Sequence, residues 1–129
     1  MNFLLDIQKD LRALSDESIA AHSKRFFKAI PGGYGEGDCF LGIRVPVIRT
    51  VAKKHQALSL DDSIRLLHSD YHEERLAALI IWVNQFKKAD QNIQKTIYGL
   101  YLNHTSYINN WDLVDVSAPH IIGAYLSDK

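Results

Sequence analysis

The sequence predicts an all-α protein built as a HEAT-like helical repeat, that is, an α-α superhelix or solenoid of about seven helices. Apolar residues recur at helical spacing in nearly every segment, and no segment alternates convincingly at a period of two. The expected helices have short links and fall into pairs at about 2–30, 45–69 and 71–104, with an unpaired helix last. Stacked antiparallel helix pairs are typical of HEAT or armadillo repeats, whose units run to roughly 40 residues. The pairs share no clear sequence repeat, so the prediction depends on helix number and linkage.

Two helices are expected in the first thirty residues. Residues 2–14 carry apolar side chains at helical spacing, and Ser15-Asp16-Glu17-Ser18 offers a cap and an acidic first turn for a helix that runs to about Ile30. Pro31-Gly32-Gly33 ends that helix. The stretch 31–42 contains five of the seven glycines but lacks the spacing of a nucleotide-binding loop. A mobile surface loop is therefore favoured there, with backbone contact to a polyanion as the weaker alternative.

Two helices form the second pair. One begins after Arg44-Val45-Pro46, because proline is tolerated in a first turn, and it directs Arg49 and Lys53 outward. The run Ser59-Leu-Asp-Asp62 opens the next helix with an acidic first turn.

Three more helices complete the expected fold. Asp70 precedes Glu73 by three residues, a capping-box pattern ahead of a long apolar run. Asp90 is a candidate cap for the helix that follows. The last helix begins near Asn110 and meets Pro119, which must kink the helix or restart it with Ser117 as a new cap.

Length and composition predict one compact domain over residues 1–129, and its formal net charge is zero. The charge is unevenly distributed, since seven Lys and Arg residues face only two acidic residues between positions 24 and 54. The single cysteine, Cys39, excludes an internal disulfide and fits a reducing interior. The sequence shows no secretory signal and no apolar run of membrane-spanning length, so we expect a cytoplasmic protein without membrane association.

Catalytic motifs of several common classes are missing from the sequence. His72-Glu73-Glu74-Arg75-Leu76 lacks the final histidine of a His-Glu-x-x-His zinc motif, and Cys39 has no histidine nearby in sequence. There is no Gly-x-Ser-x-Gly nucleophile turn. We therefore expect no metal and no cofactor.

Trp111 and Asp115 form the most informative pair in the chain. Their spacing places an indole and a carboxylate side by side on a helix that Asn109-Asn110 can cap. An aromatic face beside an anion suits a sugar or a cationic base. Residue spacing alone also allows a structural interpretation, and favours it, in which Trp111 belongs to a core stripe and the aspartates complement the helix dipole. The members of that stripe are Trp111, Val114, Ala118, Ile121, Ile122 and Tyr125.

Four segments together resemble the DNA alkylation repair enzymes of the AlkD-like DNA glycosylase family. They are Phe40-Leu-Gly-Ile-Arg-Val-Pro46, His72-Glu73-x-Arg75 with its Ala-Leu run, Phe86-Lys-Lys-Ala-Asp90 and Asn109-Asn-Trp-Asp-Leu-Val-Asp115. The resemblance implies a HEAT-like stack whose basic concave surface holds duplex DNA with alkylated bases. It also implies a hydrolase that excises N3- or N7-alkylated purines without the base flipping common among such enzymes.

The resemblance implies a role for individual residues. Asp115 matches the catalytic carboxylate, Trp111 matches an aromatic that contacts the deoxyribose, and Phe26 matches an aromatic near the substrate. An alkylated purine is a good leaving group because it is positively charged, so an anion beside an electron-rich ring can stabilise the developing oxocarbenium centre. For DNA binding we expect the basic residues of the cation-rich segment: Lys24, Arg25, Lys28, Arg44, Arg49 and Lys53.

The chain departs from the family pattern at its end. The family continues for several more helices, which carry an arginine of the site, whereas this chain resembles only the amino-terminal part and is expected to be an incomplete or inactive glycosylase. The alternative function is a non-catalytic HEAT-like binding module for nucleic acid or protein. Residues 111–126 also carry more apolar side chains than one inward stripe needs, which predicts a homodimer through this segment.

Overall fold

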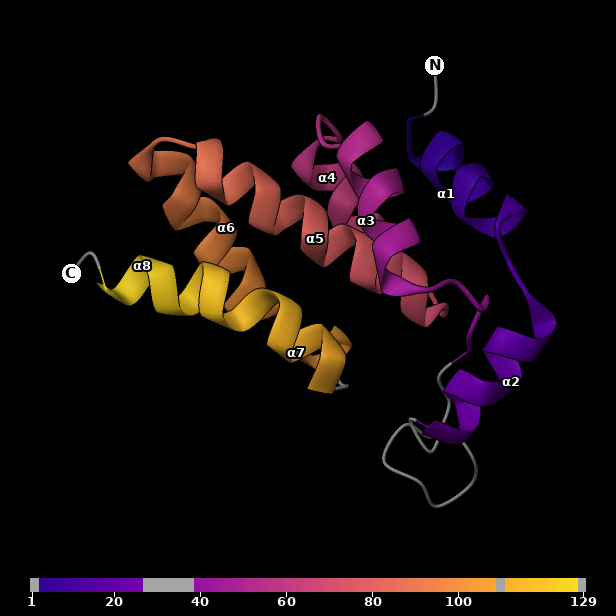
Figure 1. The fold of residues 1–129 in the computed structure, drawn as a ribbon. Helices are drawn as coiled ribbons and strands as arrows, with labels where there is room; N and C mark the ends of the chain where they lie inside the picture. Colours follow the sequence, from indigo (N-terminus) through magenta and orange to yellow (C-terminus); the bar gives the residue numbers. More distant parts are fainter. Residues whose placement is uncertain (1–2, 27–38, 109–110, 128–129) are drawn as a thin grey trace.

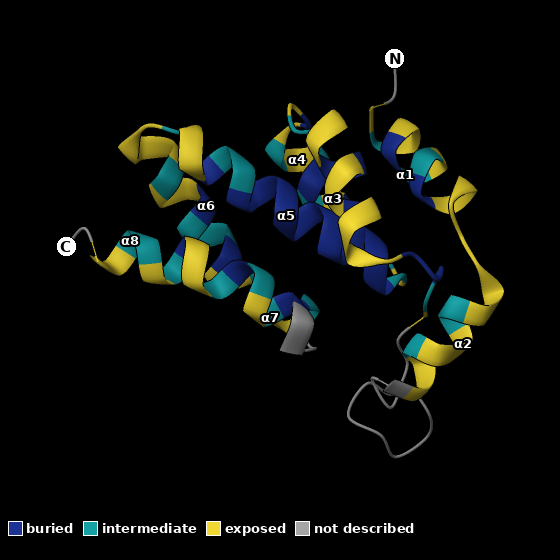
Figure 2. Ribbon diagram, in the orientation of Figure 1, coloured by how far each residue is buried: buried dark blue, intermediate teal, exposed yellow. Residues whose placement is uncertain are grey.

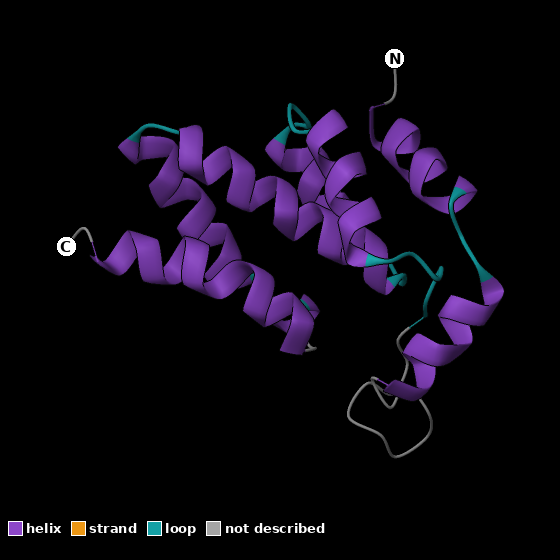
Figure 3. Cartoon of the chain, in the orientation of Figure 1, coloured by secondary structure: helices purple, strands orange, loops and turns teal. Residues whose placement is uncertain are grey.

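The computed structural model describes residues 3–26, 39–108 and 111–127, with the side chains of Phe26, Trp111 and Asp112 outside this description. Over these residues the chain is helical (Figure 3), and its only extended pairing is an isolated bridge between Cys39 and Tyr71. The all-α prediction is confirmed, and the architecture is consistent with a helical repeat. The elements are α1 (Phe3–Ala13), α2 (Glu17–Phe26), α3 (Val45–Lys54), α4 (Leu60–Leu67), α5 (His72–Lys88), α6 (Gln91–Asn103), the 3₁₀ helix η1 (Thr105–Tyr107), α7 (Trp111–Ala118), the π-helical η2 (Pro119–Gly123) and α8 (Ala124–Ser127).

The centre of the molecule is α5. Every residue from His72 to Val83 is buried (Figure 2), because α3 and α4 pack against one part of this helix while α6 and α7 pack against another. A helix surrounded in this way has no solvated stripe, which explains its nearly continuous apolar sequence. The indole N–H of Trp82, in the middle of α5, donates to the Ser63 hydroxyl of α4 at 2.6 Å, so the polar atom of this large side chain is satisfied.

The first two helices do not form the packed pair that the sequence predicts. Helix α1 packs mainly on α3 and α4 through the fully buried Ile7 and Leu11, while α2 lies at the side of the helical body (Figure 1). None of the described side chains of α2 is buried. The expected continuation of α2 to Ile30 and the glycine-rich residues 31–38 lie outside the described residues. Residues 41 and 42, expected to belong to a surface loop, are instead buried.

The helix caps confirm part of the sequence analysis. The side chains of Ser59 and Asp90 accept the backbone N–H groups of Asp62 and Ile93 at 3.1 and 3.0 Å. The capping box at Asp70 and Glu73 is wrong: Tyr71 occupies the N-cap of α5 without a side-chain cap, and Glu73 points to a different partner.

Pro119 does not restart the last helix with Ser117 as a cap; it opens a local distortion of that helix, a π-helical turn. The chain continues from α7 through the π-helical turn η2 into α8. The wider turn accommodates the proline ring and the missing backbone N–H. Ser117 is fully buried inside the helix rather than exposed as a cap.

The apolar residues of 111–126 are divided between core and surface. Leu113 and Ile121 are fully buried, Tyr125 stacks on Tyr98 of α6 at 4.2 Å, and Leu126 is 52% exposed. Since α5 and α6 cover much of this set, the homodimer through 111–126 stays a prediction. Within the described ranges, no helix combines the length and the apolar character needed to cross a bilayer.

Candidate functional site

Asp115 lies on the side of α7 that faces away from the core. Leu113 and Ser117 are fully buried, whereas Asp115 between them is exposed. Position 111 precedes Asp115 by one helical turn, so the two positions share a side of the helix. The described members of the core stripe that the sequence suggested do lie against the core: Ile121 is fully buried, and Val114, Ala118, Ile122 and Tyr125 are partly buried. The stripe omitted Leu113 and Ser117, which are also fully buried. The Trp111 side chain and the Asn109-Asn110 cap lie outside the described residues.

A buried hydroxyl pair fixes the rotation of α7. The Tyr101 hydroxyl of α6 lies 2.8 Å from the Ser117 hydroxyl, and Ser117 donates its own proton to the Leu113 carbonyl. Tyr101 is therefore the donor in the pair. Burial raises the pKa of Tyr101, with the Ser117 hydrogen bond acting in the opposite direction, so the phenol stays protonated. This contact holds Ser117 inward and leaves Asp115 outward.

Three aromatic rings gather at the entry to α7. His68, the C-cap of α4, stacks on Tyr107 of η1 with ring centroids 4.2 Å apart, and the His104 ring lies 5.3 Å from that of His68. His104 is anchored by a 2.7 Å hydrogen bond between its Nδ1 and the Leu100 carbonyl. Burial, and then the nearby His104, lower the pKa of His68. The stack attaches the segment that leads into α7 to the end of α4.

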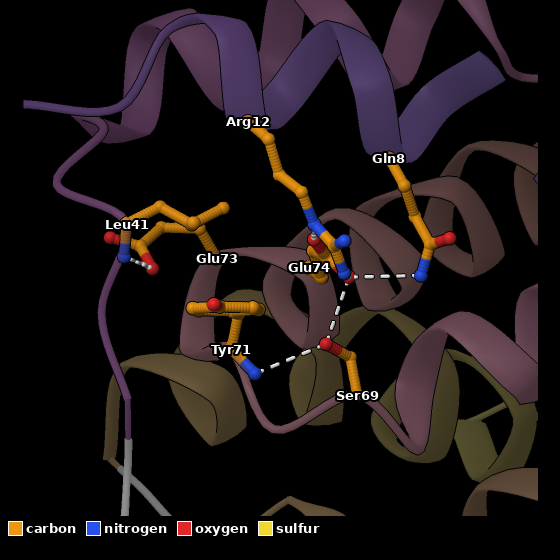
Figure 4. Close-up of polar contacts among 7 residues, drawn as sticks. All are labelled: Gln8, Arg12, Leu41, Ser69, Tyr71, Glu73 and Glu74. Atoms are coloured by element: carbon orange, nitrogen blue, oxygen red, sulfur yellow. Dashed lines mark hydrogen bonds and ion pairs between the residues drawn. The ribbon is translucent and has the colours of Figure 1, made fainter. Parts of the chain in front are cut away.

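The buried carboxylate of Glu73 binds the backbone of the segment 41–43. Its oxygens accept the N–H groups of Leu41, Gly42 and Ile43 at 2.9, 2.8 and 3.3 Å (Figure 4 shows the contact with Leu41). Gly42 has φ +85°, a conformation that side chains with a Cβ rarely adopt. The turn aims three consecutive amides at one anion, as in the backbone nests that bind anions elsewhere.

The same turn attaches α2 to the rest of the protein. The Asp16 N–H donates to the Leu41 carbonyl at 2.9 Å, and a Cβ at position 42 would lie 1.9 Å from the Asp16 carbonyl oxygen. Only glycine permits this approach. The Asp16 side chain then caps α2 by accepting the N–H groups of Ser18 and Ile19.

Glu74, the next residue, binds α1. Its fully buried carboxylate accepts the Arg12 Nε–H at 2.8 Å, the Gln8 amide at 3.1 Å and the Ser69 hydroxyl at 2.8 Å (Figure 4). The Arg12 guanidinium also lies over the Tyr71 ring, 5.2 Å from its centroid. The two adjacent buried acids thus bind different segments of the chain: Glu73 binds residues 41–43, and Glu74 binds α1.

The basic residues expected to bind DNA are exposed wherever they are described. Lys24 and Arg25 occupy the last turn of α2, Arg44 is the N-cap of α3, and Arg49 and Lys53 lie one turn apart on α3. Lys28 lies outside the described residues, as does the Phe26 side chain at the end of α2. The described residues contain no group of three or more His, Cys, Asp or Glu side chains suited to hold a metal ion.

Sequence reasoning missed the structural parts of this arrangement: Gly42, Glu73, Glu74, Tyr101 and Ser117. One signal was available for the two glutamates, because adjacent acids at the start of a continuously apolar helix need partners when they are buried. Nothing in the spacing of residues indicated which segments would supply those partners.

The fold and these residues define an all-α protein with an exposed carboxylate on α7 and exposed cations on α2 and α3. Residues 7–129 match the family described as DNA alkylation repair enzyme. This chain belongs to that family, and membership implies a role in DNA alkylation repair with DNA as the partner. No curated protein and no solved structure gives a significant match to the chain.

Replacing Glu73 by glutamine tests its contact with the backbone turn. The variant keeps the shape but presents an amide N–H₂ to the amides of 41–43, so we expect the free energy of unfolding to fall by about 2–3 kcal/mol. Urea unfolding followed by circular dichroism measures the change. Glu17→Gln, at an exposed position in α2, is the control and should stay within about 0.5 kcal/mol of the parent protein. An equally small change in both variants would contradict the assigned contact.

The depressed pKa of His68 predicts a pH dependence of stability. The unfolded chain binds a proton at His68 more tightly than the folded chain, so stability contributed by neutral His68 is complete above the unfolded pKa of about 6.5 and declines below it. His68→Gln removes this titration and should flatten the fall of the urea midpoint between pH 8 and pH 5.5. His120→Gln, at an exposed position in η2, should retain the parent slope. Identical slopes for all three proteins would exclude His68 as a source.

Proposed function

We propose that this chain is a DNA glycosylase that hydrolytically releases N3- or N7-alkylated purines from duplex DNA. The observation that carries the proposal is the exposed Asp115, held outward on α7 by the inward Ser117, in a member of a DNA alkylation repair family. An exposed carboxylate held on a packed helix can approach the sugar of a bound duplex.

Release of a cationic base needs little from the protein beyond electrostatic stabilisation of the positive charge that develops on the sugar. The C1′–N bond breaks with its electron pair passing to the cationic base, which leaves neutral, while positive charge develops on the sugar. Asp115 stabilises that charge and accepts a hydrogen bond from the water that attacks C1′; the released proton passes to solvent. Trp111, one turn earlier, is proposed to pack against the deoxyribose, and Phe26 to contact the substrate from α2.

Release of 7-methylguanine from methylated duplex DNA tests the role of Asp115. Asp115→Asn removes the negative charge and keeps the size, so the release rate should fall at least about 100-fold, as for other preorganised charge-stabilising groups. Asp61→Asn, at an exposed position in α4, is the matched control and should release base at the parent rate. Unchanged release by Asp115→Asn would exclude it as the catalytic carboxylate. If the parent protein binds the duplex and releases no base, a non-catalytic nucleic-acid binding module is the correct function.

DNA binding is proposed to use the exposed cations of α2 and α3: Lys24, Arg25, Arg44, Arg49 and Lys53, together with Lys28. A double charge reversal, Arg49→Glu with Lys53→Glu, removes two phosphate contacts. The slope of log affinity against log salt concentration should therefore become shallower by about 0.9 per contact. Arg65→Glu, on the exposed surface of α4, serves as the control and should leave the slope unchanged. The same slope for the double variant and the parent would remove these two residues from the interface.

A further inference from the structure

A hollow of about 470 Å³ lies where α2, the segment 40–44 and the first turns of α3 and α5 meet. Its volume is within the range typical of small-molecule sites. It is separate from the exposed face of α7, because no described residue of α7 lines it. The role proposed for Asp115 therefore leaves this hollow without a function.

The inner wall of the hollow is apolar and includes paired rings. Ile43, Ile48 and Leu76 are buried side chains of this wall. The ring of Phe40 lies 4.9 Å from that of His72 with an interplanar angle of 35°. A wall of this kind suits a flat, weakly polar ring system, and base-to-aromatic stacking is tolerant of base identity.

The rim of the hollow is cationic. Arg44 lines it and is exposed. Phe40 also borders a second hollow of about 250 Å³, which Lys24 lines. Two exposed cations therefore flank one aromatic ring. Among the described lining residues the acidic one is Glu73, and its oxygens are directed to three backbone amides.

We propose that this hollow binds one unpaired nucleotide of DNA. Its base packs against Phe40 and His72, and its flanking phosphates lie near Arg44 and Lys24. The Arg44 guanidinium and the Lys24 ammonium match phosphate, and the apolar wall matches a base that has left its stack. The proposal rests on DNA as the partner in the proposed function and is independent of base release.

Fluorescence titration with duplexes that carry 2-aminopurine tests the site. One duplex places the base in a single-nucleotide bulge, a second pairs it with thymine, and a third has an abasic bulge with a dye at its end. We expect the protein to bind the bulged base about tenfold more tightly than the paired one, and the abasic bulge to lose this preference. Equal affinity for the bulged and paired duplexes would overturn the proposal.

Two variants and one control assign the preference to this hollow. Ser23→Phe fills the hollow from α2 and should abolish the preference without weakening binding to the paired duplex. Arg44→Gln should weaken binding to the bulged duplex more than to the paired one. Arg49→Gln, which changes an exposed arginine in the middle of α3 that is not in the lining, should weaken both equally. Equal effects of the two arginine variants, or a preference that survives Ser23→Phe, would contradict the assignment.

The free nucleotide separates failure of this site from failure of the proposed function. 2-Aminopurine deoxyribonucleoside 5′-monophosphate should be quenched saturably by the parent protein and not by Ser23→Phe. Saturable quenching without duplex binding would support nucleotide binding in the hollow and would exclude the proposed glycosylase activity on duplex DNA. Duplex binding with no preference for the bulged base and no quenching of the free nucleotide would exclude nucleotide binding in the hollow and leave the proposed function in place. Absence of both duplex binding and quenching would exclude both proposals.

Discussion

The Glu73 carboxylate is the interaction on which the arrangement of the first half of the chain depends. It accepts three consecutive amides of 41–43 and so fixes the turn at Gly42 against the first turn of α5. Helix α2, which has no buried side chain among its described residues, is attached through that turn by the Asp16–Leu41 hydrogen bond. Arg44 and the start of α3 follow directly. A charge this deeply buried is tolerated because each of its partners is a donor whose own hydrogen-bonding needs it satisfies.

Helix α7, which carries Asp115, is positioned against the same central helix by a different kind of contact. Helix α7 packs on α5 and is rotated into place by the hydroxyl pair of Tyr101 and Ser117, while the His68–Tyr107 stack attaches the segment before it. The result is a rigid core helix with cations carried by α2 and α3 and a carboxylate carried by α7. Of the segments that resemble the family, residues 41–43 and 73–74 hold helices together, whereas residues 111–115 carry the catalytic role that we propose.

The helices and several caps could be predicted because their causes are local. Apolar periodicity defined α1, α3, α5 and α6, and the caps at Ser59 and Asp90 need only a neighbour three residues on. Glu73 was misassigned for the opposite reason: its local pattern fits a capping box, but its real partners lie about 30 residues earlier in the chain. The π-helical turn at Pro119 depends on packing of both its ends, which spacing does not report. For the site, the i,i+4 relation of 111 and 115 was predictable, whereas the burial of Ser117 involves Tyr101, which lies in another helix.

The Glu73 side chain orders the segment 41–43, and amide hydrogen exchange measures that order directly. In the native protein the N–H groups of Leu41, Gly42 and Ile43 lie outside any helix, yet all three are buried and bonded to Glu73. Their exchange should therefore be slowed to the same extent as that of the buried amides of α5, since both exchange only when this unit unfolds. Exchange of these three amides at the rate of an exposed loop, while α5 remains protected, would contradict the account.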